Sequence, residues 1–292
     1  MKDWLEKHIT IIFIMPIMLF ILGMVVFPLC YTLYLSFTQW SMGVRPPLFI
    51  GFENYKHLLT DERFWNAAGR TLYLAVGSVL IQIILGLALA VFLNREFSGK
   101  NFAKTLFLLP MIATPVAIGM VWLLIYEPTL GVANYLLRQI GLEPVLWLIT
   151  KEAVLNSIIL IEVWQWMPMV TLIILAGLSG LPSDPYESAI VDGANRFQIF
   201  SRITLPLIAP TVVVVALLRL IDSLKTFDLI YSMTQGGPLF ASETLNLYIY
   251  TMTFGYFRMG MGSALVFLFI VIIAMVTSVV ILIRKRVGYL YQ

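Results

Sequence analysis

Six long apolar stretches limit what this chain can fold into. A helix needs about 20 apolar residues to cross the hydrocarbon core of a bilayer. Six segments qualify: residues 9–37, 71–93, 105–126, 153–178, 206–228 and 260–283. Only 12% of all residues are charged, whereas a soluble domain carries about 25%. The sequence therefore predicts an all-helical integral membrane protein with six spans and both termini on one side.

Basic residues near the spans indicate the orientation, because cytoplasmic loops of membrane proteins carry an excess of Lys and Arg. If residues 1–8 lie in the cytoplasm, ten basic residues fall on the inner side and seven on the outer side. We therefore expect both termini and the polar segment 183–206 to face the cytoplasm. The connections 127–152 and 229–259 are expected outside.

The polar segment 183–206 lies between the fourth and fifth spans. We expect Asp184 to be the N-cap of a short helix, with Pro185 at its first position and Glu187 completing a capping box. Gly193 then ends this helix in the left-handed conformation. Such a capped and charged helix indicates a contact site for a soluble partner, although Glu187 could serve only to stabilise its own helix. The charged residues of the segment are Asp184, Glu187, Asp192, Arg196 and Arg202.

The same segment resembles the EAA signature of ABC importer permeases, which reads E-A-A, three residues, G, nine residues, I-x-L-P. A serine replaces the middle alanine of the signature. Residues 51–55, 234–238 and 262–265 are similar to the maltose-type, carbohydrate-uptake branch of that family. The positions that match the signature are Glu187, Ser188, Ala189, Gly193, Ile203, Leu205 and Pro206.

The resemblance implies a type I importer-like fold, in which residues 9–292 form one transmembrane domain and 183–206 form a helix-turn-helix that couples to an ATPase. It also implies a non-enzymatic permease subunit of a bacterial cytoplasmic (inner) membrane importer, forming half of the path for a sugar or oligosaccharide. The implied partners are a second, different permease, an extracytoplasmic solute-binding protein and two ATP-binding subunits that hold ATP and Mg, so no cofactor is expected in this chain. The implied ATPase-coupling residues are Glu187, Ser188, Ala189, Asp192, Gly193, Arg196, Leu205 and Pro206.

Two polar stripes inside the spans are candidates for the solute path. Charged side chains within a bilayer are costly, so they mostly face a bundle interior or a cavity. Carboxylates accept hydrogen bonds from hydroxyls and a tryptophan stacks on a sugar ring, and sugar permeases use this part of the fifth span. Glu162 and Arg219 lie at similar depth and could share one cavity. The fourth-span stripe is Glu162, Trp166 and Met169, and the fifth-span stripe is Arg219, Asp222, Ser223 and Thr226.

Other interpretations of these residues stay open. Arg219 with Asp222, and Lys225 with Asp228, are spaced i, i+3 and could simply neutralise each other. Glu162, Asp222 or Lys225 could instead relay protons in a secondary transporter. A membrane-embedded enzyme is a third possibility, and Arg219 leaves room for an anionic solute.

The remaining composition argues against other classes of function. The net charge of +3 is too small to indicate nucleic-acid binding. Cys30 is the single cysteine, and His8 and His57 are far apart in the sequence, so no metal site is expected. There is no Walker A sequence, so the energy for transport must come from another chain.

Overall fold

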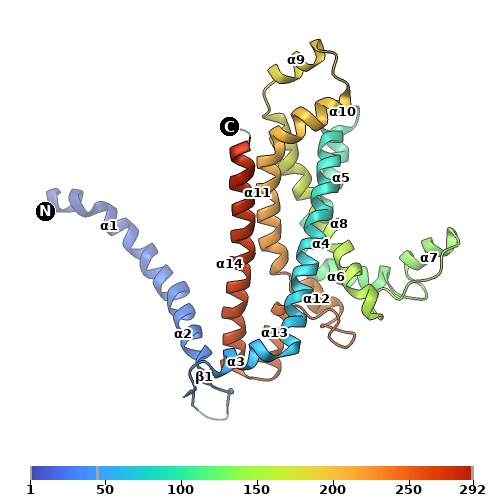
Figure 1. Cartoon of the computed structure of the whole chain (residues 1–292). Helices are drawn as coiled ribbons and strands as arrows, with labels where there is room; N and C mark the ends of the chain where they lie inside the picture. The colour runs from blue at the N-terminus through green and yellow to red at the C-terminus, as the bar shows by residue number, and fades with distance from the viewer. Residues whose placement is uncertain (1, 44–45, 291–292) are drawn as a thin grey trace. The chain divides into compact units, whose positions relative to one another are not determined.

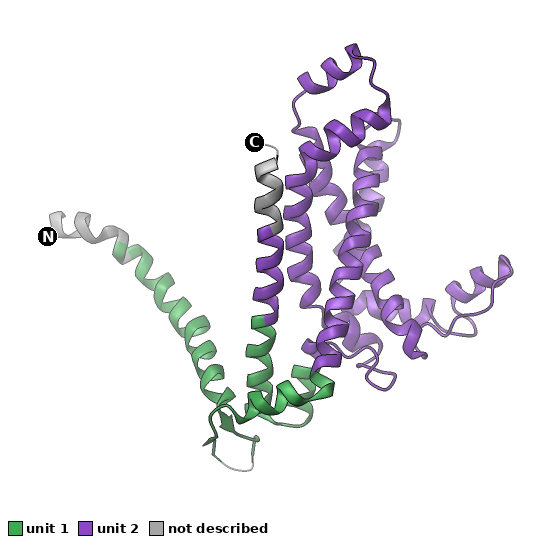
Figure 2. Cartoon of the chain, viewed as in Figure 1, with its two compact units in different colours: residues 1–64, 248–271 green, residues 65–247, 272–292 purple. Residues whose placement is uncertain are grey.

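The structure is a computed structural model that describes residues 2–43 and 46–290 (Figure 1). The chain divides into two compact units, shown in green and purple in Figure 2. Unit 1 comprises residues 1–64 and 248–271, and unit 2 comprises residues 65–247 and 272–292. The predicted N-terminal segment 1–8 begins at Met1, and the predicted domain ends at Gln292. Both of these terminal residues lie outside the described part.

Unit 1 starts with a long apolar helix that contains one π turn. α1 (Lys2–Ile21), η1 (Leu22–Val26) and α2 (Phe27–Ser36) follow one another directly. Proline has no N–H to donate to the preceding turn, and the π turn lies just before Pro28, where the wider turn accommodates that missing bond.

A small hairpin follows this helix in unit 1. β1 (Thr38–Gln39) pairs antiparallel with β2 (Leu48–Phe49), and α3 (Glu53–Thr60) comes next. The buried Asn54 side chain donates through Nδ2 to the carbonyl oxygens of Ser36 and Thr38, both at 2.9 Å. This amide therefore fixes α3 against the end of α2 and the first strand.

Unit 2 consists of long helices joined by short helical connections. Its central element is the fourth predicted span, which is α8 (Lys151–Ser179). In the most apolar stretch of this helix 61% of the residues are buried, the largest share among the described spans. From the fourth helix onward the elements of the chain are α4 (Glu62–Leu93), α5 (Lys100–Ile112), α6 (Pro115–Ile125), α7 (Val132–Gln139), α8 (Lys151–Ser179), α9 (Asp184–Val191), α10 (Arg196–Ile199), η2 (Phe200–Thr204), α11 (Leu205–Leu224), α12 (Asp228–Met233), α13 (Leu245–Tyr250), η3 (Thr251–Gly255) and α14 (Met259–Leu290). Of these, η3 and the parts of α4, α13 and α14 that fall within residues 1–64 or 248–271 belong to unit 1.

An apolar core joins α4, α8 and α11 inside unit 2. Gly177 lets α8 and α11 approach closely, because a Cβ there would lie 2.7 Å from Ile208 Cδ1 and 2.9 Å from Thr211 Cγ2. Small residues serve such close contacts between membrane helices. The buried core residues are Ala90, Leu93, Val170, Ile174, Leu175, Leu178, Ile208 and Val215.

The third apolar segment differs from the expectation of one helix over residues 105–126. α5 and α6 meet at an angle of 98° across a break at Ala113 and Thr114. The residue before a proline disfavours helical dihedrals, and Thr114 has an extended backbone with ψ of 146° before Pro115. Its hydroxyl then accepts a hydrogen bond from Ala117 N, which caps α6. Within the described residues, five helices are long and apolar enough to cross a membrane, and the bent pair of α5 and α6 brings the number to six if it is one span.

The fifth apolar segment also ends earlier than the expected residue 228. α11 stops at Leu224, with Lys225 as its C-cap, and α12 begins a new helix at Asp228. The residues between them are therefore not helical, and Thr226 lies just beyond the helix rather than on one of its faces.

Candidate functional site

The segment between α8 and α11 forms the predicted helix-turn-helix, but its first cap differs from the prediction. Ser183 is the N-cap of α9, and no side chain accepts a capping hydrogen bond there. The helix therefore begins one residue earlier than expected, so Asp184 is its first residue and Glu187 is one position too late for a capping box. The hydroxyl of Ser183 donates instead to Asp184 Oδ1 at 3.3 Å.

The turn after α9 depends on Gly193, as expected from the sequence. Its φ is +75°, which favours glycine. Gly193 N donates to Ile190 O at 3.1 Å, and Ala194 N donates to Ala189 O at 2.9 Å. These two bonds make a Schellman motif. Gly193 thus turns the chain so that only four residues separate the end of α9 from the start of α10.

α10 carries the capping box that the sequence analysis placed on α9. Asn195 Oδ1 accepts from Gln198 N at 2.9 Å, and Gln198 Oε1 accepts from Asn195 N at 2.8 Å. The N-x-x-Q spacing that marks such a box is visible in the sequence. The helix then continues through η2 into α11, so that Arg196–Leu224 is one helix of 29 residues.

The helix-turn-helix is largely exposed and has an apolar tip. Three large apolar side chains on it, Ile190, Val191 and Phe197, are 65%, 87% and 76% exposed. Among the predicted coupling residues only one, Ala189, packs inward. Exposed apolar residues that cluster on a polar segment are typical of protein interfaces. The exposed coupling residues are Glu187, Ser188, Asp192, Gly193 and Arg196, while Leu205 and Pro206 begin α11.

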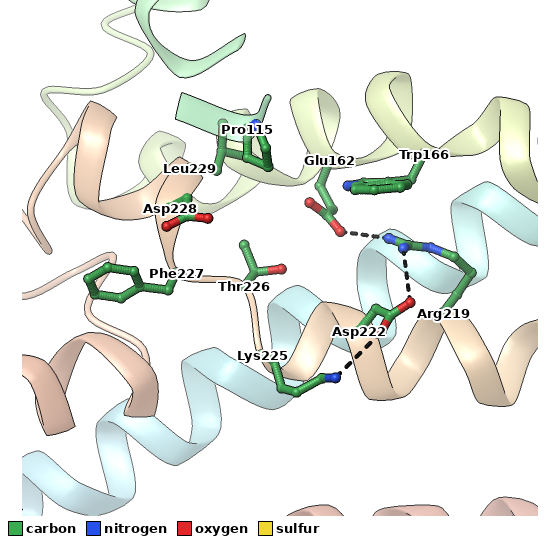
Figure 3. Close-up of a pocket in the computed structure, with 10 residues that line it drawn as sticks. All are labelled: Pro115, Glu162, Trp166, Arg219, Asp222, Lys225, Thr226, Phe227, Asp228 and Leu229. Atoms are coloured by element: carbon green, nitrogen blue, oxygen red, sulfur yellow. Dashed lines mark hydrogen bonds and ion pairs between the residues drawn. The ribbon is translucent and has the colours of Figure 1, made fainter. Parts of the chain in front are cut away.

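The two polar stripes converge on a cavity of about 400 Å3 in unit 2 (Figure 3). The walls come from α8, from the end of α11, from the start of α12 and from the first residue of α6. The lining residues are Pro115, Glu162, Trp166, Arg219, Asp222, Lys225, Thr226, Phe227, Asp228 and Leu229.

Arg219 is the most connected side chain of this cavity and is only 1% exposed. Its Nη2 pairs with Glu162 Oε1 at 2.8 Å, and its Nε donates to Gln82 Oε1 at 3.0 Å. Its guanidinium also lies over the Trp166 ring, 4.7 Å from the ring centre. The predicted meeting of Glu162 and Arg219 is thus present, and α4, α8 and α11 each supply one partner.

The outer wall of the cavity is more exposed, and of the two ion pairs that the i, i+3 spacing suggested it contains, within the described residues, only the one between Arg219 and Asp222. Asp222 Oδ2 lies 3.8 Å from Arg219 Nη1, and Asp222 Oδ1 lies 3.5 Å from Lys225 Nζ. Lys225 therefore pairs with Asp222 and not with Asp228, because Asp228 belongs to the next helix, across the end of α11. Among the described residues, no ion pair joins Asp228.

Two predicted solute-path residues lie outside the cavity. Met169 is half-buried in α8, and Ser223 is buried with its hydroxyl 3.0 Å from that of Ser78. Gln82 is a partner that sequence reasoning missed. It is the only amide side chain within the otherwise uncharged segment 71–93, and its Nε2 donates to Glu162 O at 3.0 Å. An isolated amide side chain in an apolar span therefore indicates a hydrogen-bond partner for a buried polar group.

Among the described residues, no group of three or more His, Cys, Asp or Glu side chains is placed to hold a metal ion. The cavity offers carboxylates, an ammonium, a hydroxyl and aromatic rings around a buried ion pair. This arrangement can hydrogen-bond a polar solute. The geometry fits solute passage.

Comparisons with known proteins identify the family. The family model described as binding-protein-dependent transport system inner membrane component matches residues 82–289. The probable ABC transporter permease y4oQ of Sinorhizobium fredii is 41% identical over 271 residues, 91% of this chain and 86% of that protein. The trehalose/maltose transport system permease MalF of Thermococcus litoralis is 33% identical over 277 residues, 94% of this chain and 92% of that protein.

A solved structure agrees with this result. A chain of a bacterial ABC transporter involved in the import of the acidic polysaccharide alginate matches with a TM-score of 0.84 and 25% identity. The match covers 98% of this chain and 99% of that one. Because the family model spans more than half of the sequence and the relatives cover nearly all of it, this chain belongs to the binding-protein-dependent inner membrane components, the permeases of ABC importers.

Proposed function

We propose that this chain is one permease subunit of an ATP-driven importer and forms half of the membrane path for a sugar or oligosaccharide. The observation that carries this proposal is the similarity along nearly the whole chain to permeases named for trehalose/maltose and for multiple sugars. The cavity supports it, because carboxylates accept hydrogen bonds from hydroxyl groups and aromatic rings stack on sugar faces. Family membership favours this function over proton-coupled secondary transport.

The proposed partners follow from the same family. One solved neighbour is a bacterial alginate ABC transporter in complex with a periplasmic protein that carries an alginate pentasaccharide. For this chain we expect a second permease, a solute-binding protein outside the membrane and two ATP-binding subunits that hold ATP and Mg. The protein is then a multi-pass component of the bacterial cytoplasmic membrane with both termini and the segment 183–206 in the cytoplasm, and bond chemistry occurs only in the ATPases.

The helix-turn-helix is proposed to receive the motion of the ATPase. Its apolar tip and its exposed charges would occupy a cleft on that partner, where a preformed helix loses little entropy on docking. The Tyr186 hydroxyl donates to Thr204 Oγ1 at 3.2 Å, which ties α9 to the π turn η2. Movement of either helix is thereby passed to α11, which carries Arg219 and Asp222 in the cavity.

The test is reconstitution in proteoliposomes with the second permease, the ATPases and the binding protein, followed by solute-stimulated ATP hydrolysis across a panel of sugars. Gly193→Val should reduce the stimulation at least tenfold, because valine is strained at a φ of +75° and the turn would open. Glu187→Lys should reduce it as well, since it reverses a charge on the exposed face of α9.

Gly141→Val is a matched control. Gly141 also has a positive φ, of +76°, and open space around its Cβ position, as Gly193 has. It lies after α7, far along the chain from the coupling segment, so it should leave the stimulation near wild type. If Gly193→Val and Glu187→Lys also leave it intact, the coupling assignment is wrong. Uptake that collapses with the proton gradient and continues without the ATPase would favour the secondary transporter.

A further inference from the structure

The relatives do not decide whether the transported saccharide is neutral or acidic. MalF of Thermococcus litoralis is named for trehalose/maltose, whereas the solved neighbour imports the acidic polysaccharide alginate. Both resemble this chain over nearly its full length. The choice must therefore come from the charges that line this chain's own cavity, and Arg219 is the residue that could favour an acid.

Arg219 is already occupied by the protein. Its Nε and Nη2 donate to Gln82 and Glu162 at 3.0 and 2.8 Å, and one face of its guanidinium is covered by Trp166. The side chain is 1% exposed, and its third nitrogen, Nη1, lies 3.8 Å from Asp222 Oδ2, so an anionic solute would have to displace a carboxylate of the protein to reach it. Displacement of Glu162 would leave a buried carboxylate without its counter-ion, which is strongly unfavourable. Arg219 is thus no receptor for an acidic sugar.

The lining as a whole is net negative. Three carboxylates, Glu162, Asp222 and Asp228, face two cations, Arg219 and Lys225, which leaves one excess negative charge. Asp222 contacts both cations, at 3.8 and 3.5 Å. Asp228 is exposed to the cavity, and no ion pair within the described residues holds it. A concave wall of low dielectric concentrates the field of such an unbalanced charge.

We infer that this cavity selects an uncharged saccharide over an acidic one, with Asp228 as the carboxylate that sets this preference. The inference rests on the proposed function, because it concerns the solute of the same cavity. Asp222 and Asp228 can each accept hydrogen bonds from hydroxyl groups of a neutral sugar. A carboxylate on the solute would meet the same oxygens as a like charge, which disfavours its binding.

The experiment compares two probes that differ in one charge. The first is a neutral oligosaccharide that stimulates ATP hydrolysis in the sugar panel, and the second is the same oligosaccharide with one terminal primary alcohol oxidised to a carboxylate. Equilibrium binding of both is measured on the assembled permease–ATPase complex in nanodiscs, with the binding protein left out so that its own selectivity does not enter. The readout is the ratio of the two dissociation constants.

Wild-type complex should bind the neutral probe at least about tenfold more tightly, which corresponds to about 1.4 kcal/mol. Asp228→Asn should lower this ratio several-fold, and Asp228→Lys should reverse it. Glu143→Lys makes the same charge change as Asp228→Lys at an exposed loop position outside the cavity, so the ratio should stay at the wild-type value.

Equal or tighter binding of the carboxylated probe to wild type would overturn the inference, as would Asp228 variants that leave the ratio unchanged. In either case the proposed function stands, because saccharide binding and stimulated hydrolysis are still present. If no saccharide of the panel stimulates hydrolysis or binds, the proposed function itself fails and the inference falls with it.

Discussion

Glu162 and Arg219 show how a charged pair can persist inside a membrane segment. Removing two charges from water is costly, and the mutual attraction offsets that cost only when further hydrogen bonds complete the pair. Gln82 supplies such a bond to Arg219 and another to the backbone of Glu162. Trp166 covers the guanidinium face. Each member of this group therefore depends on the others.

Glu162→Gln should lower the free energy of unfolding by about 3–5 kcal/mol, because it leaves the Arg219 charge buried without its partner. Lys225→Met is the control, since it removes an ion pair whose side chains are 53% and 51% exposed, and such pairs contribute about 0–1 kcal/mol. Denaturant titration of the purified chain in detergent measures the free energy of unfolding of both variants. The double variant Glu162→Gln/Arg219→Gln should lose less than Glu162→Gln alone, and an equal loss in Glu162→Gln and Lys225→Met would contradict the argument.

Glu127, in the loop after α6, gives a pH-dependent prediction. The N–H groups of Leu130 and Thr129 donate to its carboxylate, which lowers its pKa below the ordinary value. A lowered pKa in the folded state means that the stabilisation is complete above the ordinary value and disappears as the pH falls through the folded pKa. We expect hydrogen exchange at the Leu130 amide, corrected for intrinsic rate, to lose protection in that acid range. Glu127→Gln should abolish this pH dependence. Protection of the Leu130 amide that does not change with pH in the wild type would disprove the prediction.

At the residue scale, the sequence predicted which charged residues line the cavity better than it predicted the ion pairs between them. Charges within apolar segments stand out, so Glu162, Arg219 and Asp222 could be found by inspection. The ion-pair partner of Lys225 could not be found in this way, because the choice between Asp222 and Asp228 depends on where α11 ends. Likewise, Asp184 and Ser183 can both cap a helix, and nothing in the local spacing chooses between them.

At the scale of helices, the break between α5 and α6 and the contact of α8 with α11 decide how the spans are arranged. Hydropathy predicted the six apolar segments because the bilayer requires their length. It could not reveal the 98° bend, since residues 105–126 form one uncharged apolar stretch on both sides of Thr114. Thr114-Pro115 was the available signal, because an X-Pro step favours extended backbone.

The contact of α8 with α11 yields a test at Gly177. Gly177→Ala places a methyl group 2.7 Å from Ile208 Cδ1, so overpacking should cost about 1–3 kcal/mol of unfolding free energy. Adding Ile208→Val, which removes that Cδ1 atom, should restore part of the loss. Gly180→Ala is the control, because its methyl group would meet atoms no nearer than 3.6 Å. Denaturant titration measures all three, and equal losses at the two glycines would refute this account of the packing.

For the whole molecule, the central expectation is the side of the membrane on which the helix-turn-helix lies. Basic residues favour the cytoplasm for this segment, and the proposed ATPase partners would bind it there. These two arguments are independent, since one counts charges and the other rests on similarity to known permeases. The loop that contains Glu143 should lie on the opposite side, because one membrane span, α8, separates it from the helix-turn-helix.

Cysteine labelling tests this orientation directly. Cys30 is the single cysteine and is exposed, so Cys30→Ala gives a background without reactive thiols. Asp192→Cys on that background should react with a membrane-impermeant maleimide in inside-out vesicles and remain unlabelled in right-side-out vesicles. Glu143→Cys should show the reverse pattern. Labelling of the Asp192→Cys variant only from the outer face would rule out the importer assignment.

The helix that links the docking turn to the cavity has a mechanical consequence. It passes through the π turn η2 and then Pro206 before it continues as α11, and wide turns and prolines are the places where helices bend. α11 itself has 20 residues, about 30 Å, with Arg219 near the end that is remote from the docking turn. Tilting α11 by about 5° around its centre displaces each end by about 1.3 Å, a sizeable part of the 2.8 Å that separates Arg219 from Glu162 on the neighbouring helix. A small stroke applied by an engine at the docking turn therefore reaches the ion pair through this wider turn.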